Sequence, residues 1–310
     1  MNIIKNVKTN RQYVEDYIEY IKSVQGYSER TVVSYSHDLE RLCVFLDSEN
    51  KTVCEMTYED AKKFSLGLYD SKLSSATINR ILSANRSFFH NLCESGIIVS
   101  SPFSRVSRAK QGRRIPSVLS DKELEMLLDS PVEDFTQLME VTMFNLFYST
   151  GCRLSELINV RIQDVDIPAR RITVLGKGNK QRYVFLSDRA VHYLDAYIEQ
   201  RSETVRRNNS ETDLLLVNKK GKQLPLSTVH IIFDKYRVKL GITKKFTPHV
   251  FRHTFATNLL ENNSDIRIVQ TLLGHESIGT TQIYTHVTGK RLENVYNNSH
   301  PHSGKNRKEH

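Results

Sequence analysis

The sequence has few cysteines, no long apolar run and no sustained internal repeat. Its 310 residues include only four cysteines, which lack the paired spacing of zinc ligands and are interpreted as buried or incidental thiols suited to a reducing cytosol: Cys43, Cys54, Cys93 and Cys152. No apolar stretch is long enough to span a bilayer, and the N-terminus lacks a secretory apolar region. These absences argue against a disulfide scaffold, a membrane protein and a repeat architecture. We expect a cytoplasmic protein.

Basic side chains outnumber acidic ones. The 44 lysines and arginines against 35 aspartates and glutamates give a formal net charge of +9 and an isoelectric point near 9.3. Such a balance fits a polyanionic partner such as nucleic acid. Basic soluble proteins are common, so the charge alone does not identify the partner.

The first third of the chain predicts four helices. Apolar residues recur at helical spacing over residues 9–24, 28–47, 57–70 and 74–94, and the third helix opens on the capping signature TYED. A stretch without acidic side chains follows, and its arginines are candidates for contacting DNA phosphates: Arg105, Arg108, Arg113 and Arg114. A merely solvated linker explains each of these arginines equally well. We expect a domain over 1–104, a basic linker over 105–118, a second domain over 119–300 and a disordered tail over 301–310.

The second domain is predicted to be mostly helical with one β-rich interruption. A capping signature, SDKE, opens it, and helices are expected near 188–206, 227–240 and 248–261. Over roughly 162–186, RRITVL and QRYVFL flank a GKGNK turn, which predicts an antiparallel β-hairpin. The expected fold class is therefore mainly α, a four-helix domain followed by an α+β domain with a small hairpin.

Four motifs in the second half contain the residue types needed to attack a phosphodiester. TGCRLSEL, LGKGNKQR, HVFRHTFAT and LLGHESIGTTQIYTH supply two guanidiniums, an ammonium, two imidazoles and a phenol, namely Arg153, Arg252, Lys177, His249, His275 and Tyr284. Arginines stabilise the extra negative charge of a five-coordinate phosphorus, and a lysine can protonate a poor leaving group. A tyrosine in cationic surroundings can act as the nucleophile, so no metal ion is needed.

Local spacing supports this grouping. His249 and Arg252 are three residues apart, so a helix over 248–261 places both on one face. The other sides of that helix are expected to pack through apolar residues: Val250, Phe251, Phe255, Leu259 and Leu260. Thr247 and Pro248 indicate an N-cap and first helical position, and Gly151 ends an apolar stretch just before Arg153.

Each residue has an ordinary structural explanation when taken alone. Arg153 could form an ion pair with Glu156, and Lys177 could belong to a solvated hairpin turn. His275 could cap a helix, and Tyr284 could pack in a core. His249 and His253 have the i, i+4 spacing of zinc ligands, but the intervening Val-Phe-Arg lacks the glutamate of a zinc protease and adds a cation, so no metal is expected. The ordered combination favours the catalytic interpretation.

Together the four motifs resemble those of the tyrosine recombinases of the phage-integrase family, and within it the Xer type. The resemblance implies a C-shaped clamp around double-stranded DNA, with 1–104 as core-binding domain and 119–300 as catalytic domain. It implies that Tyr284 forms a 3′-phosphotyrosyl intermediate, that His249 handles the nucleophile's proton and that His275 assists by hydrogen bonding. No cofactor is implied.

The resemblance also implies partners and a cellular role. These are a homotetramer, or a heterotetramer with a second Xer-type recombinase, on two DNA sites, a septal DNA translocase, and resolution of chromosome dimers at cell division. A mobile-element integrase, a type IB-like topoisomerase and a DNA-binding regulator without catalysis are the alternatives. Cys152, Phe185 and Phe251 depart from the usual family residues, but none of them removes a catalytic group.

Overall fold

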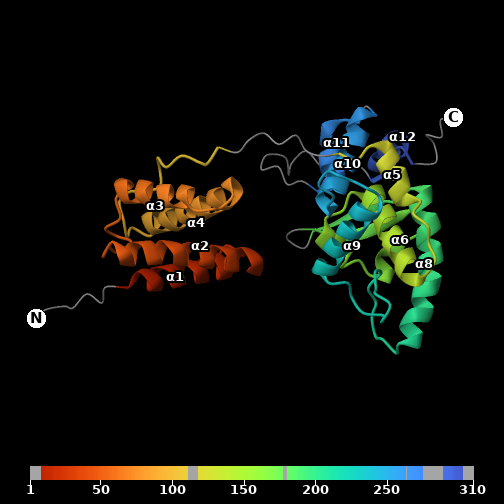
Figure 1. The fold of residues 1–310 in the computed structure, drawn as a ribbon, viewed down its shortest axis with the longest axis horizontal. Helices are drawn as coiled ribbons and strands as arrows, with labels where there is room; N and C mark the ends of the chain where they lie inside the picture. The colour runs from red at the N-terminus through yellow and green to blue at the C-terminus, as the bar shows by residue number, and fades with distance from the viewer. Residues whose placement is uncertain (1–7, 111–117, 177–179, 263, 275–288, 303–310) are drawn as a thin grey trace, which may run out of the picture. The chain divides into compact units, whose positions relative to one another are not determined.

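The computed structural model divides into two compact units, Met1–Arg114 and Ile115–His310. It describes residues 8–110, 118–176, 180–262, 264–274 and 289–302 (Figure 1). The two units are described separately below. No helix among these residues is long and apolar enough to cross a membrane.

The first unit contains four helices, and each matches its prediction to within one residue at either end. They are α1 (Asn10–Ser23), α2 (Glu29–Ser48), α3 (Tyr58–Asp70) and α4 (Ser75–Glu94). A serine or threonine side chain caps the N-terminus of every one, and the TYED capping box at Thr57 is confirmed. Their apolar faces enclose one core that includes Tyr17, Leu39, Phe64 and Phe88.

The segment after α4 remains packed on this unit as far as Ala109. Phe103 is fully buried in the core, and the Asn79 side chain exchanges two hydrogen bonds with the backbone of Ala109. Arg105 and Arg108 are exposed. Arg113 and Arg114 lie outside the described residues.

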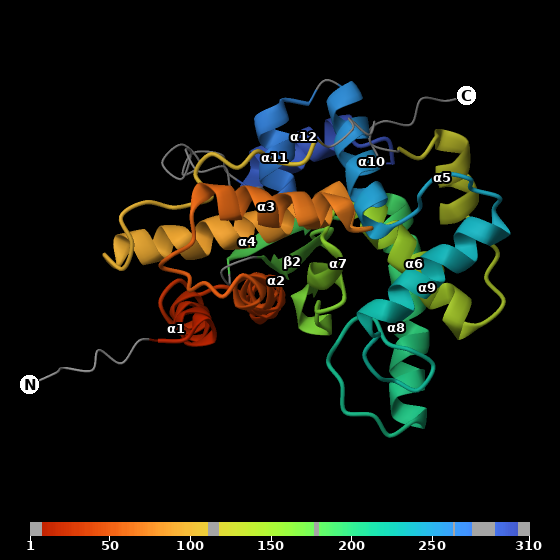
Figure 2. The same cartoon turned by 60° about the vertical axis from the view of Figure 1, so that its left-hand side comes forward.

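The second unit is mostly helical and contains a small sheet (Figures 1 and 2). Its helices are α5 (Asp121–Leu128), α6 (Phe135–Thr150), α7 (Leu154–Leu157), α8 (Asp188–Arg207), α9 (Leu226–Lys239), α10 (Pro248–Glu261), α11 (Ile266–Leu273) and α12 (Gly289–Ser299). A 3₁₀ turn, η1 (Ile162–Asp164), leads into β1 (Val165–Asp166), β2 (Arg171–Leu175) and β3 (Gln181–Phe185), which pair antiparallel in the order β1-β2-β3. The mainly α fold class and the hairpin are confirmed.

Helix α6 forms the centre of the second unit. All of its residues from Leu138 to Thr150 are buried, and it packs against α5, α8, α10 and β3. Phe144 lies within an aromatic cluster, with ring centroids 4.8 Å from Tyr236 and 5.8 Å from Phe251. The helix that precedes Arg153 is therefore held on several sides.

Gly151 ends α6 in a left-handed conformation with φ of 60°. A Cβ atom at this position would lie 2.5 Å from Cδ1 of Phe255, closer than any real contact. Glycine is therefore needed at this position both for the left-handed turn and for the close approach of α10. The predicted end of the apolar stretch at this residue is confirmed.

Helix α10 begins as predicted, with Thr247 as N-cap and Pro248 in its first turn. Four of the five apolar residues expected to pack are buried, but Leu260 is 40% exposed, so that prediction is wrong. Leu260 lies about three helical turns after the exposed His249 and therefore falls on the same exposed side of α10, whereas Leu259 in the same last turn is fully buried.

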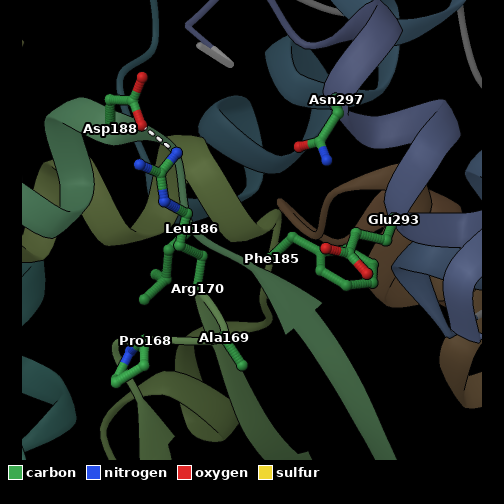
Figure 3. Close-up of a pocket in the computed structure, with 8 residues that line it drawn as sticks. All are labelled: Pro168, Ala169, Arg170, Phe185, Leu186, Asp188, Glu293 and Asn297. Atoms are coloured by element: carbon green, nitrogen blue, oxygen red, sulfur yellow. Dashed lines mark hydrogen bonds and ion pairs between the residues drawn. The ribbon is translucent and has the colours of Figure 1, made fainter. Parts of the chain in front are cut away.

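The last described helix, α12, is anchored by buried polar and aromatic contacts. The hydroxyl of Tyr296 lies 2.9 Å from Oγ of Ser149 on α6, and its ring lies 5.5 Å from that of Phe185 on β3. His300 is buried, and this burial lowers the pKa of its imidazole to about 3. Glu293 and Asn297 of α12 line a cavity of about 400 Å³ together with Arg170 and Phe185 (Figure 3).

Gly151→Ala should destabilise the second unit more than the same substitution at Gly241. Both glycines have φ near 60–65°, but a Cβ at Gly241 meets no atom within 4 Å. Left-handed backbone costs about 1–2 kcal/mol for alanine, and overpacking against Phe255 adds about 1–3 kcal/mol. Urea unfolding of both variants, followed by circular dichroism, measures the difference, and equal losses of stability would contradict the packing argument.

Candidate active site

Arg153 is the N-cap residue of the short helix α7, two residues beyond Gly151. Its backbone N–H donates to Oε2 of Glu156 at 2.9 Å, and its Nη1 donates to Oε1 of the same carboxylate at 2.8 Å. The ion pair that the i, i+3 spacing allowed is therefore present. It holds the backbone and the guanidinium tip of Arg153 and uses one of the five guanidinium N–H groups.

Glu156 is shared with a second arginine, Arg182 on β3. Nη1 and Nη2 of Arg182 donate to the two carboxylate oxygens at 3.0 and 2.8 Å. The Glu156 side chain is only 4% exposed, and it now accepts four N–H groups, which is the full capacity of a carboxylate. Burial alone would raise the pKa of Glu156, but the hydrogen bonds and charges of Arg182 and Arg153 lower it to about 2.

Three arginines meet at the C-terminal end of α11. The carbonyl oxygens of residues 272, 273 and 274 accept, in that order, from Arg182, Arg252 and Arg153. The last carbonyls of a helix have no partner within it and carry the negative end of the helix dipole, so cations are favourable there. Guanidiniums from β3, α10 and the cap of α7 therefore converge on one helix end.

Arg252 projects from α10 and also donates Nη1 to the carbonyl of Gly151 at 2.8 Å. Burial, together with repulsion from Arg153 and Arg182, lowers its pKa to about 10, although Glu156 opposes this. A lowered arginine pKa means that cations are crowded in a partly desolvated place. Such a place favours the arrival of an anion.

His249 lies one turn before Arg252 on α10 and is exposed, whereas the intervening Val250 and Phe251 are buried. The helix predicted for this motif is confirmed. Among the residues that the structure describes, no three or more histidine, cysteine, aspartate or glutamate side chains are grouped as metal ligands.

Lys177, His275 and Tyr284 lie outside the described residues, and their placement remains a prediction. The chain next to two of them is described. Gly176 precedes Lys177, and a Cβ at Gly176 would lie 3.5 Å from Nη1 of Arg182. Gly274 precedes His275, and its carbonyl oxygen accepts a hydrogen bond from Arg153. Gly176 and Gly274, the described residues that precede Lys177 and His275, therefore lie beside the arginine cluster.

Arg182 was not among the residues predicted for the site. A signal for it was present in the strand pattern, because Arg182 alternates with exposed neighbours and pairs in register with the buried Val174. An arginine on the inward face of a strand requires a partner. That partner, Glu156, is 26 residues earlier in the chain.

Three arginines and one glutamate give this cluster a formal charge of +2. Arg153 and Arg252 each use two of their five guanidinium N–H groups on described residues, and these residues leave up to three on each arginine for a ligand. Paired, fixed donors of this kind suit the oxygens of a phosphate. A groove of about 520 Å³ between α7 and β2 reaches the cluster at Glu156.

Comparison with known families agrees with this arrangement. Residues 117–291 match the Phage integrase family, and residues 14–96 match the Phage integrase N-terminal SAM-like domain. The first match contains all six predicted catalytic residues, and the second covers the four-helix unit.

Curated relatives are similar along nearly the whole chain. Tyrosine recombinase XerD of Oceanobacillus iheyensis is 36% identical over 290 residues, covering 93% of this chain and 98% of the relative. Tyrosine recombinase XerC of the same organism is 36% identical over 300 residues, covering 95% and 98%. The XerC of Bacillus subtilis is 36% identical over 307 residues, covering 97% and 99%.

Solved structures show the same fold. A XerH site-specific recombinase bound to a palindromic difH substrate in a post-cleavage complex aligns with a TM-score of 0.70 at 23% identity, covering 91% of this chain and 83% of that one. The Tn1549 transposon integrase in complex with a circular intermediate DNA aligns with a TM-score of 0.69 at 18% identity, covering 93% and 98%.

Replacing Glu156 by glutamine should remove a pH-dependent part of the stability. The pKa of Glu156 is about 2 in the folded protein against an ordinary value of 4.5, so its contribution is complete above pH 4.5 and is lost as the pH falls towards 2. We expect the wild type to be more stable than Glu156→Gln at pH 7 by on the order of 3 kcal/mol, and the gap to close between pH 4.5 and 2. Urea unfolding across this range measures it.

The control is Glu203→Gln, which removes an exposed i, i+4 pair with Arg207 on α8. Its effect should stay within about 0.5 kcal/mol. A stability gap for Glu156→Gln that does not change with pH would contradict the assignment of the ionised carboxylate.

Proposed function

The chain belongs to the phage integrase family, and from that membership we propose that it is a site-specific DNA recombinase that cuts and rejoins strands through a phosphotyrosine. The observation that carries this proposal is the cluster of Arg153, Arg182 and Arg252, in which Arg153 and Arg252 keep guanidinium N–H groups that no described residue uses and that suit a phosphate. Fixed cations of this kind stabilise a transition state whose non-bridging oxygens gain negative charge.

The proposed cleavage step uses only protein side chains. The phenolic oxygen of Tyr284 attacks the phosphorus, the bond from phosphorus to the 5′-oxygen breaks, and Lys177 donates the proton that the leaving oxygen takes up. His249 accepts the proton of the phenol, and His275 hydrogen bonds to the phosphate. The free 5′-hydroxyl of a partner strand then reverses the step, so the bond energy is kept and neither a metal ion nor a nucleotide cofactor is required.

The proposed substrate is double-stranded DNA. The DNA-bound state of similar structures and the net charge of +9 support this. We place domain boundaries at 1–104 and 119–300 and propose that both domains bind the duplex, with Arg105, Arg108, Arg113 and Arg114 contacting its phosphates. The protein acts in the cytoplasm.

The proposed cellular role is resolution of chromosome dimers at cell division. It is supported by relatives named XerC and XerD, to which the chain is equally similar in one organism. The assembly is a tetramer on two DNA sites, formed by this chain alone or with a second Xer-type recombinase, and a septal DNA translocase is the proposed activator.

A nicked duplex with random sequence on both sides of the nick tests the cleavage chemistry. Cleavage next to the nick releases a short fragment, so the covalent protein–DNA adduct accumulates and can be recovered from a denaturing gel. Sequencing the recovered DNA then gives the preferred duplex. Tyr284→Phe should bind that duplex with the wild-type dissociation constant and form no adduct, because it lacks the attacking oxygen. A loss of only a few-fold in adduct would contradict the assignment.

A second test separates the general acid from the phosphate clamp. Lys177→Ala should slow cleavage by about 10²- to 10⁴-fold on the recovered duplex, because the 5′-oxygen then leaves without its proton. A duplex with sulfur in place of that bridging oxygen should restore most of the rate, since a thiolate leaves unprotonated. Single-turnover rates measure both effects.

Arg153→Ala is the matched control for the sulfur substrate. Its charge serves the non-bridging oxygens in both duplexes, so the sulfur should give no recovery. Equal recovery of the two variants, or of neither, would refute the role of Lys177.

A further inference from the structure

We infer that Arg182 is a positioning residue for strand cleavage, which controls through Glu156 how strongly Arg153 acts on the scissile phosphate. This inference rests on the proposed function. Arg182 itself need not touch DNA, because three of its five N–H groups are used on Glu156 and on the carbonyl of Leu272, and its side chain is only 17% exposed.

The charge of Glu156 is the first step of the argument. Its carboxylate is buried and divides its four hydrogen bonds equally, two with Arg153 and two with Arg182. If Arg182 is removed, a buried negative charge loses half of its donors and one neighbouring cation. The remaining charge then has Arg153 as its only hydrogen-bonded cation among the described residues and offsets more of the positive field that the phosphate requires.

The geometry of α11 is the second step. Arg182 donates to the first of the three adjacent carbonyls at its end, and Arg252 and Arg153 donate to the next two. A Cβ at Gly274 would lie 3.1 Å from Cζ of Arg182, so the guanidinium lies directly against this turn. Arg182 therefore links β3, α7 and α11. Its loss should change the positions of the guanidiniums of Arg153 and Arg252, the two candidate phosphate-binding arginines.

Lysine cannot replace Arg182 in this arrangement. The two parallel N–H···O bonds to Glu156 and the third bond to Leu272 require the planar fork of a guanidinium. A lysine would preserve one charge beside Glu156 and lose the fixed geometry.

The test compares four variants on the recovered nicked duplex: Arg182→Met, Arg182→Lys, Glu156→Gln and the double variant Arg182→Met/Glu156→Gln. Single-turnover cleavage by Arg182→Met should be about 10²-fold slower than wild type, the size expected for a small misplacement of reacting groups, and the dissociation constant should stay within about 3-fold. Arg182→Lys should cleave about 10-fold more slowly than wild type. The double variant should cleave at least about 10-fold faster than Arg182→Met, because the unpaired carboxylate is gone.

The pH profile gives a readout that a purely structural role would not alter. With Arg182 replaced by methionine, Glu156 has fewer donors and its pKa rises, so protonation becomes accessible nearer to neutral pH. Cleavage by Arg182→Met should therefore increase relative to wild type as the pH falls from 7 towards 5, and the double variant should lose this increase.

Arg171→Met is the matched control. Arg171 belongs to the neighbouring strand β2 and pairs with the partly exposed Asp166, and the substitution should leave the cleavage rate unchanged within about 2-fold. Thermal unfolding of every variant shows which are folded. If Arg182→Met does not fold, the inference is tested with Arg182→Lys.

Three results would overturn the inference: wild-type rates for Arg182→Met and Arg182→Lys, a double variant no faster than Arg182→Met, or an unaltered pH profile. A wild-type protein that forms no adduct on any duplex would instead overturn the proposed function, and the role of Arg182 with it. Normal wild-type cleavage with unaffected Arg182 variants would remove the role of Arg182 alone.

Discussion

The arrangement of the candidate site depends on the pairing of the buried Glu156 carboxylate with Arg153 and Arg182. Three guanidiniums repel one another, and this repulsion adds to the larger effect of burial in lowering the pKa of Arg252 to about 10. Glu156 and the carbonyls at the end of α11 supply the negative partners that allow them to stay together. The cations are therefore already oriented before any phosphate arrives, and little reorganisation remains for the reaction itself.

Buried contacts among α6, α10, α12 and β3 hold in place the elements that carry this cluster. The buried helix α6 ends at Gly151, whose carbonyl accepts from Arg252, and α10 passes close enough to require a glycine there. Helix α12 then packs on α6 and β3 through Tyr296. Because β3 also carries Arg182, the same strand packs against α12 and contributes a residue to the arginine cluster.

Much of this could be predicted from sequence because it depends on local patterns. Capping residues and apolar periodicity gave the helix limits, and the motifs identified Arg153 and Arg252 before their side chains could be placed. Arg182 was missed because its role depends on a tertiary partner, Glu156. Leu260 was wrongly expected to pack because it was counted as apolar without regard to its side of the helix, which is the side of the exposed His249. The roles of Lys177, His275 and Tyr284 remain predictions from motif order and chemistry.

The convergence of three arginines on the C-terminal end of α11 also has a consequence for biosynthesis. Arg153 and the carbonyl of Gly274 that it binds are 121 residues apart in the chain. At translation rates of roughly 5–20 residues per second, the ribosome needs about 6–24 s to make the second partner after the first. The complete cationic cluster therefore cannot assemble before residue 274 has been made, and a truncated product that ends before α11 lacks the helix end that organises the three arginines.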